Sequence, residues 1–313
     1  MSRSRRTVHS RIAVLAPTAL LGALAACGPG SGAEQFSMPA SNADIRSSAS
    51  PLSSVEMEPL STSRSAPVYW LSESDGTVSL YREFVSIPGA GDPIAASVRH
   101  MLSAKPQDPA YFNLWRPSKS IGASVSAENV ITLDLEKKAF AASLDRGLAE
   151  RSIAQLVYTA TAAASNAGIL SDGVEPSVKI LVDGSSDFMA FGKIPLEQAF
   201  TREVKLAAPL WIIDPLFGST QASGHVAFHG LTASFTGGEY WSIARKATKK
   251  HPGVEGEVIA SGRIHTGGDA LDSNEFSFSY MLDPGEYVFS AWGVDKPSGM
   301  KVAVESKTFT VQD

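Results

Sequence analysis

The sequence contains a single cysteine, Cys27, and its position is the clearest sign of covalent chemistry in the chain. It follows Leu24-Ala25-Ala26 at the end of an apolar run that begins at Ile12, and four arginines stand among the first eleven residues. A basic start, a short apolar run and small residues before a cut site are typical of a secretory signal. At fifteen residues the run is shorter than the roughly 20 that a membrane-spanning helix needs. One cysteine also excludes an intramolecular disulfide, so the exported part must be stable through its core.

The segment Leu24-Ala25-Ala26-Cys27 resembles the bacterial lipobox. The resemblance implies that the thiol of Cys27 receives a diacylglycerol, that the preceding bond is cut and that the new N-terminus is acylated. We therefore expect residues 1–26 to be a removable signal, and the mature chain to be a lipoprotein at the extracytoplasmic face of the cell membrane. Several acyl chains anchor firmly, because each buried methylene contributes about 0.8 kcal/mol. Ser4-Arg5-Arg6 is also similar to a twin-arginine signal, so general secretion and twin-arginine export both stay open.

The other residues that could do chemistry form no catalytic or metal-binding pattern. His225 and His229 are four apart in an expected strand, which separates them by roughly 13 Å, too far to hold one metal ion. Asp183 and Asp187 stand beside glycine and serine, as turn residues do. The segment Gly89-Ala90-Gly91-Asp92-Pro93 lacks the third glycine of a dinucleotide loop, and no Gly-x-Ser-x-Gly motif occurs. His100 has no acidic or histidine neighbour at i+4 in its expected helix, and His251 and His265 stand in or near expected loops. Asp269 and Asp272 are interpreted as turn residues, like Asp183 and Asp187. We therefore expect no catalytic residue, no metal and no cofactor.

Aromatic side chains are the remaining candidates for contact with a partner. Tyr111, Phe112 and Trp115 stand in a loop bounded by prolines, and exposed aromatics of this kind are enriched in binding hot spots. If they are exposed, they are the first candidates for a partner contact; if Trp115 instead belongs to the core, its replacement by Ala should lower stability strongly. Trp241 and Trp292 stand in expected strands and are assigned to the core.

Charge and length limit the kinds of partner and the number of domains. The formal net charge is −5, and it becomes −9 once residues 1–26 are removed. A chain this acidic is a poor candidate for binding nucleic acid or anionic lipid head groups. The 287 residues that remain suggest two domains, at roughly 100–200 residues each.

A flexible tether is expected between the lipid and the first domain. Residues 27–66 are rich in Ser, Ala and Pro and have no apolar periodicity, so they cannot offset the entropy of ordering. About 40 such residues give an average reach of about 35 Å. The first domain is assigned to 67–203 and the second to 206–313.

Periodicity in the first domain predicts a mixed α/β fold. The expected strands are 68–71, 78–87, 121–125, 130–135 and 178–182, and the expected helices are 94–104 and 150–167. This order resembles the GerM-type domain of sporulation and spore-germination proteins over about residues 67–200. The likeness is carried by Val68-Tyr69-Trp70-Leu71, Val85-Ser86-Ile87-Pro88, Asn129-Val130-Ile131-Thr132-Leu133-Asp134-Leu135, Ala154-Gln155-Leu156-Val157-Tyr158-Thr159 and Val178-Lys179-Ile180-Leu181-Val182-Asp183-Gly184. The resemblance implies an extracytoplasmic α/β domain for envelope assembly or protein–protein contact.

Short alternating segments in the second domain predict an all-β sandwich. The expected strands are 210–213, 225–231, 239–247, 257–264, 275–282, 287–294 and 301–311, the last interrupted near Ser306. Asp283-Pro284-Gly285-Glu286-Tyr287 resembles a tyrosine corner, and Phe289 stands where antibody domains place a cysteine. With Ile213-Asp214-Pro215 and the segment from Gly224 to Phe235, this part resembles the immunoglobulin-like domain of bacterial spore germination.

The expected architecture is thus α+β, a GerM-like α/β domain followed by an all-β immunoglobulin-like sandwich. The expected function is that of a non-catalytic adaptor or assembly lipoprotein, anchored through Cys27 and binding envelope proteins that the sequence does not identify. A second hypothesis is a peptidoglycan- or glycan-binding wall module, in which exposed aromatics stack on sugar faces. A third is a hydrolase without a recognisable motif.

Overall fold

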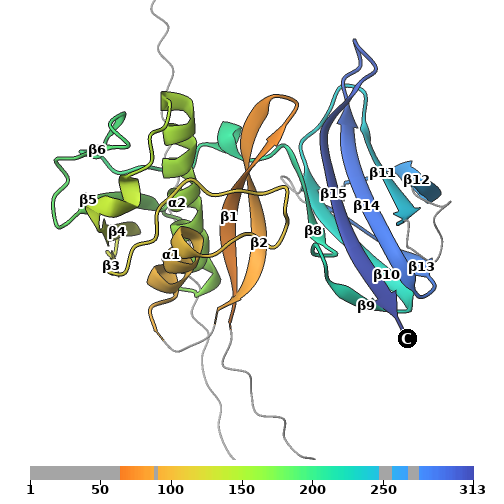
Figure 1. The fold of residues 1–313 in the computed structure, drawn as a ribbon, viewed down its shortest axis with the longest axis horizontal. Coiled ribbons are helices and arrows are strands. Elements are labelled where there is room, and N and C mark those ends of the chain that lie inside the picture. The colour runs from red at the N-terminus through yellow and green to blue at the C-terminus, as the bar shows by residue number, and fades with distance from the viewer. Residues whose placement is uncertain (1–63, 88–90, 247–255, 267–274) are drawn as a thin grey trace, which may run out of the picture. The chain divides into compact units, whose positions relative to one another are not determined.

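The protein is described here by a computed structural model, which describes residues 64–313 apart from 88–90, 247–255 and 267–274 (Figure 1). All of these residues belong to one compact unit, Glu58–Asp313. Cys27 and nearly all of the expected tether lie outside the described residues, as do three of the candidates named above, His251, Asp269 and Asp272. None of the helices in the described ranges has the length and hydrophobicity needed to cross a membrane.

The chain enters this unit through a long antiparallel hairpin. Strands β1 (Arg64–Ser74) and β2 (Thr77–Ile87) pair along their whole length. Asp75 and Gly76 form the turn with φ values of 53° and 72°, a left-handed pair that suits the twist of a two-residue hairpin. Strand β1 begins four residues before the strand expected at 68–71, because the pairing continues to Arg64 opposite Ile87.

Two helices pack against this hairpin. Helix α1 (Pro93–Ser103) is capped by Asp92, whose carboxylate accepts from the backbone N–H groups of Ile94 and Ala95. Helix α2 (Arg146–Asn166) begins four residues before the expected start, because Asp145 caps it by accepting from the N–H of Leu148 at 2.8 Å. Gly168, which follows the C-terminal end of α2, has a φ of 66°, as expected for the end of a helix.

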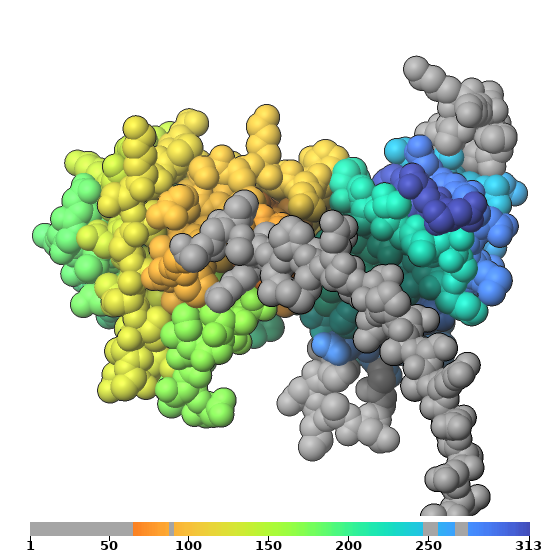
Figure 2. Space-filling model, turned by 90° about the horizontal axis from the view of Figure 1, so that it is seen from below, coloured from red at the N-terminus to blue at the C-terminus, as the bar shows by residue number. Residues whose placement is uncertain are grey.

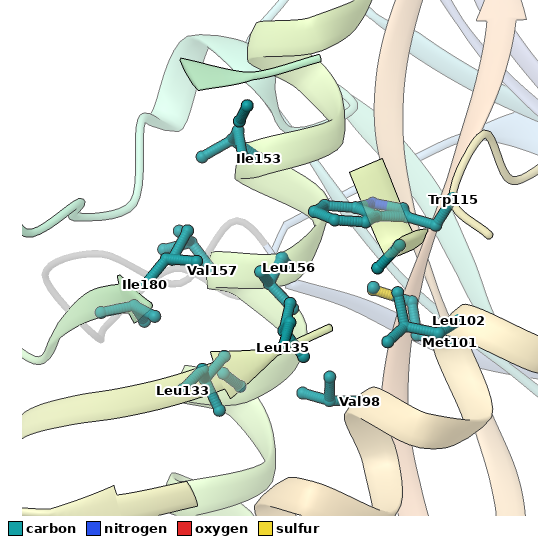
Figure 3. Packing of buried hydrophobic residues seen from close by; sticks show 14 of the residues in the cluster. Val98, Met101, Leu102, Trp115, Leu133, Leu135, Ile153, Leu156, Val157 and Ile180 are labelled. Atoms are coloured by element: carbon teal, nitrogen blue, oxygen red, sulfur yellow. The ribbon is translucent and has the colours of Figure 1, made fainter. Parts of the chain in front are cut away.

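A three-stranded sheet covers the other side of the helices. Its order is β3 (Ile121–Val125), β4 (Val130–Leu135) and β5 (Ser177–Val182), with β3–β4 antiparallel and β4–β5 parallel. Strands β3 and β4 have the predicted bounds. Leu133, Leu135 and Ile180 point from this sheet toward Leu156 and Val157 of α2 in the core (Figure 3). Short elements complete this part: η1 (Lys137–Phe140), β6 (Met189–Ala190), β7 (Ile194–Pro195) and η2 (Val204–Leu206).

The rest of the chain forms two facing β-sheets. The first has the order β13-β10-β8, and the second the order β12-β11-β14-β15-β9. Their bounds are β8 (Leu210–Asp214), β9 (Thr220–Ala222), β10 (Gly224–Thr232), β11 (Glu239–Arg245), β12 (Glu257–Arg263), β13 (Glu275–Leu282), β14 (Gly285–Val294) and β15 (Lys301–Gln312). One hydrophobic cluster takes side chains from both sheets, Phe228 and Phe276 from one and Phe289 and Phe309 from the other. The predicted α+β fold followed by an all-β sandwich is therefore confirmed.

Two expectations for the sandwich were wrong. Strand β15 is not interrupted near Ser306 but runs unbroken from Lys301 to Gln312. The apparent break in its pattern is a bulge against β14, near Ala303, whose φ is 51°. Strand β9 was not expected, because only three residues pair there, in parallel with the end of β15.

The tyrosine corner is present in the form that the sequence suggested. The hydroxyl of Tyr287 donates to the carbonyl of Asp283 at 2.8 Å, and Phe289, two residues on, is fully buried. Packing around Phe289 therefore takes the place that a disulfide has in antibody domains.

Candidate functional site

The loop from Ala104 to Pro117 carries the three aromatics that were candidates for a partner contact. Tyr111 is 7% exposed and Trp115 is 5% exposed, so neither side chain meets the condition of exposure that a partner contact requires. Phe112 is half-buried, and its backbone makes two hydrogen bonds to Leu71 of β1. The loop is thus held to the hairpin.

Trp115 belongs to the core of the α/β part. Its indole N–H donates to the carbonyl of Ser152 in α2 at 3.2 Å. Its ring lies 5.0 Å from those of Phe140 and Phe191, in edge-to-face geometry, which is favourable for aromatic pairs. Its position beside Met101 and Leu102 of α1 is seen in Figure 3.

Tyr111 points the other way, into a buried polar cluster where the α/β part meets the sandwich. We call Asp108, Tyr111, Glu305 and Lys307 the Lys307 cluster; all four are at most 7% exposed. Asp108 and Tyr111 come from the loop, and Glu305 and Lys307 from β15. The elements that supply them lie against each other in Figures 1 and 2, in yellow and orange on one side and blue and teal on the other.

Three oxygen atoms surround the Lys307 ammonium group. It donates hydrogen bonds to Asp108 Oδ2 at 2.7 Å and to the Tyr111 hydroxyl at 2.6 Å, and it forms an ion pair with Glu305 Oε1 at 3.0 Å. The Tyr111 hydroxyl in turn donates to Glu305, and the second oxygen of Glu305 accepts from the N–H of Ile212 in β8. A buried charge costs little only when it is paired and hydrogen-bonded in this way.

Further contacts extend the junction on both sides of the cluster. The N–H of Asp108 donates to the buried carboxylate of Glu83 in β2 at 2.8 Å. At the tip of the hairpin, Asp75 accepts from the N–H of Ala303, also at 2.8 Å. The hairpin and the loop therefore hold β15 at two separate points.

The cluster shifts the pKa of each titratable group it surrounds. Burial raises the pKa of Tyr111 well above its usual value, and the nearby charge of Glu305 adds to this. Burial also raises the pKa of Glu305, although the charge of Lys307 partly offsets the effect. For Lys307, burial alone lowers the pKa, but the charges of Glu305 and Asp108 outweigh it, so the pKa is raised. Lys307 thus stays charged throughout the physiological range.

Perturbed pKa values often mark catalytic groups, but this cluster has the geometry of a structural contact. Its polar atoms bond to one another, and the side chains of Lys307 and Glu305 are only 3% and 5% exposed. Lys307 and Glu305 are therefore closed to a substrate, whereas Asp108 and Tyr111 also line a surface hollow of about 530 Å³. Both β15 residues were missed from the sequence, because charged side chains in a strand are usually exposed. The sequence did contain a signal for their burial. Glu305 and Lys307 occupy the same alternating positions of the strand as the apolar Phe309 and Val311, whereas Ser306 lies on the opposite face.

An open groove of about 910 Å³ lies elsewhere, between α1, the end of α2 and the edge strand β3. Asp92 in its wall caps α1, and Asn166 donates to the carbonyl of Ser65 at 3.1 Å. Asp92 and Asn166 are therefore already engaged in holding the fold; the groove is also lined by Ser65, Ser97 and Arg99.

The other candidate histidines and aspartates lie on an outer strand face or in turns, and this local structure explains their presence without a chemical role. His225 and His229 stand on the outer side of β10, with His229 3.9 Å from Glu275. Asp183 adopts a φ of 50° in a turn. Across the described ranges, no three His, Cys, Asp or Glu side chains are grouped so that they could hold a metal ion.

The two tryptophans assigned to the core from the sequence lie on opposite faces of their sheet. Trp241 packs inward, with its ring 4.5 Å from that of Phe278. Trp292 is on the outer side of the sheet, since its neighbours Ala291 and Gly293 point inward. The core assignment is therefore wrong for Trp292.

Residues 67–187 match the family model described as Germane: Sporulation and spore germination. No characterised protein matches the whole sequence with significant similarity. Among solved structures, the tandem GerMN domains of the sporulation protein GerM from Bacillus subtilis are similar at 16% identity and a TM-score of 0.37. That match covers 50% of this chain and 51% of the GerM chain, so the chain spans about half the length of that structure. CopC from Methylosinus trichosporium OB3b is similar at 18% identity and a TM-score of 0.23, over 33% of this chain and 93% of CopC.

Proposed function

We propose that the chain is a lipid-anchored adaptor or assembly protein of the bacterial cell envelope. In this proposal Cys27 carries the lipid at the extracytoplasmic face of the membrane, the segment after it gives reach, and residues 64–313 bind envelope proteins without catalysis. The match of residues 67–187 to a family described by sporulation and spore germination supports a role in those processes.

The observation that carries the proposal is the Lys307 cluster. A protein that bridges partners must hold its binding surfaces in a fixed relation, because loose domains lose affinity to the entropy of ordering. Here two hydrophobic cores are joined by buried, charge-assisted hydrogen bonds between the 108–111 loop and β15. The geometry is that of a rigid two-part scaffold.

The titratable side chains support a non-catalytic role. The groups whose pKa is most perturbed, Tyr111, Glu305 and Lys307, are buried in contact with one another. They stabilise the junction, and Glu305 and Lys307 are closed to a substrate, whereas an acid–base catalyst must lie within hydrogen-bonding reach of its substrate.

Crosslinking in intact cells tests this function. The tagged protein is crosslinked, purified in detergent, and its partners are identified by mass spectrometry. We expect one envelope protein to be recovered repeatedly from wild type and to be lost from Lys307→Met, which loosens the junction. Lys246→Met is the matched control, because Lys246 forms an exposed ion pair with Glu286 at 3.6 Å. Recovery of the same partner from Lys307→Met in undiminished yield contradicts the scaffold role.

The anchor has its own test. Cells fed a clickable fatty acid should label the wild-type protein, and Cys27→Ser should remove the label and release the protein from the membrane fraction. Membrane retention of an unlabelled wild-type protein contradicts the lipoprotein assignment.

A further inference from the structure

The outer side of the five-stranded sheet in the sandwich carries a row of aromatic side chains next to a row of hydroxyls. Side chains alternate along a strand, so with Phe289 and Ala291 of β14 buried, Ser290 and Trp292 face outward. Residues that pair directly across strands point to the same face of a sheet. The residues paired with Ser290 and Trp292 on the neighbouring strands therefore also lie on the outer side.

The aromatic row consists of Tyr240 of β11 and Trp292 of β14. These residues are direct cross-strand partners, and their rings are 6.4 Å apart and only 19° from parallel. Both are half-buried although they lie outside the core. The two near-parallel rings add apolar surface on the outer side of the sheet, and a sugar ring can stack on the face of an aromatic ring.

The hydroxyl row lies one step along the strands. It contains one serine on each of four adjacent strands, Ser261, Ser242, Ser290 and Ser306, which the register aligns across the sheet. The hydroxyls of Ser290 and Ser306 are 2.7 Å apart. Each can both donate and accept a hydrogen bond, as a sugar hydroxyl does. The short side chains leave the adjoining rings accessible from the side.

Positive charge stands at both ends of the aromatic row. The Lys301 ammonium is 3.5 Å from the centroid of the Trp292 ring, and Arg263 is the cross-strand partner of Tyr240. Both side chains are exposed. Two acidic residues lie near Trp292 in sequence. Asp295, directly after β14, accepts hydrogen bonds from the N–H and the hydroxyl of Ser298, and Glu286, beyond the serine row, pairs with Lys246 at 3.6 Å. This local excess of positive charge contrasts with the formal net charge of −5.

We propose that this face binds an acidic polysaccharide, with a sugar ring against Tyr240 and Trp292, sugar hydroxyls on the serine row and carboxylates on Lys301 and Arg263. A neutral glycan offers no carboxylate to the two cations, and an apolar surface offers no hydrogen-bonding group to the serines. The flexible stem of Lys301 lets its ammonium leave the ring and pair with a carboxylate. This site is separate from the adaptor function and from the Lys307 cluster, so either proposal can fail alone.

Binding of the detergent-purified full chain to immobilised polygalacturonate and dextran tests the proposal. The first polymer carries a carboxylate on each sugar and the second is neutral. We expect tighter binding to polygalacturonate, and a loss of about tenfold or more in Trp292→Ala and in Tyr240→Ala, as for contacts at the centre of an interface. Lys301→Met should remove most of the preference for the acidic polymer.

Two further variants separate binding from folding. Ser306→Met leaves both rings in place but fills the exposed serine row with an uncharged side chain that cannot donate a hydrogen bond, so it should weaken binding at unchanged thermal stability. Met281→Ser lies on the other sheet, 62% exposed, and should bind as wild type does. The proposal is overturned if wild type binds neither polymer, if it binds dextran equally well, or if Ser306→Met, Trp292→Ala and Tyr240→Ala all bind as wild type does.

Discussion

Replacing Lys307 by methionine is the sharpest test of the buried junction. Methionine keeps much of the apolar stem but removes the ammonium, which leaves Asp108 and Glu305 as buried carboxylates without their shared counter-ion. Removing one partner of a buried ion pair typically costs about 3–5 kcal/mol. We expect Lys307→Met to lower the free energy of unfolding by about that amount, measured by urea denaturation with tryptophan fluorescence.

The cost should depend on pH in a direction that the cluster dictates. Burial already raises the pKa of Glu305, and loss of Lys307 removes the charge that offsets this. A carboxyl group with a raised folded-state pKa adds stability below its unfolded value, near 4.5, and that stability is lost as pH rises through the folded-state pKa. Lys307→Met should therefore be closer to wild type at about pH 5 than at about pH 8.

Lys246→Met is the matched control for Lys307→Met. The exposed pair of Lys246 with Glu286 should contribute at most about 0.5 kcal/mol, so Lys246→Met should unfold like wild type at both pH values. If Lys307→Met costs no more than Lys246→Met, or costs the same at both pH values, the cluster does not hold the junction as described.

Two other predictions test the structure at single sites. Trp115→Ala should cost about 3–5 kcal/mol of stability, because it empties a core site, while Phe112→Ala in the same loop should cost less than half of that in the same urea assay. Hydrogen bonds from Lys138, the N–H of Lys119 and Ser118 hold the pKa of Glu136 down at about 2, which carbon-detected NMR titration of the carboxylate should show directly. The stability that Glu136 adds is present above its pKa of 4.5 in the unfolded chain and is lost as pH falls toward 2. Glu136→Gln should therefore flatten the dependence of unfolding free energy on pH between these values. A Glu136 carboxylate that titrates near 4.5 contradicts the contact.

Local pattern was enough to predict the elements of the fold. Strand β4 (Val130–Leu135) alternates apolar and polar residues and was predicted at its observed bounds. Helix α2 was found from its apolar stripe, but its first turn was missed because Gly147 weakens the helical pattern there. Strand β9 has only three paired residues and no pattern of its own.

The Lys307 cluster could not be predicted in the same way. Lys307 and Asp108 are 199 residues apart in sequence, and no local rule connects a loop with a distant strand. The aromatic residues show the same limit, because Tyr111 and Trp115 are buried by contacts made outside their own loop. Trp292 was assigned to the core by residue type, whereas the phase of its strand places it outside.

A double variant distinguishes what the cluster adds in stability from what it adds in specificity. Replacing a buried ion pair with apolar residues is often neutral or stabilising, by about 1–4 kcal/mol. Lys307→Met combined with Glu305→Leu should therefore recover part of the stability that Lys307→Met alone loses, because only Asp108 is then left without its counter-ion. The N–H of Ile212 then lacks its acceptor, so the junction keeps its apolar contacts but loses directional ones.

Hydrogen exchange at Ala303, whose N–H donates to Asp75 across the same junction, reports on the arrangement independently. We expect faster exchange at Ala303 in the double variant than in wild type, because apolar contacts alone permit the two cores to shift. Equal protection of Ala303 in both proteins means that the hairpin tip fixes the arrangement and that the buried charges add only stability.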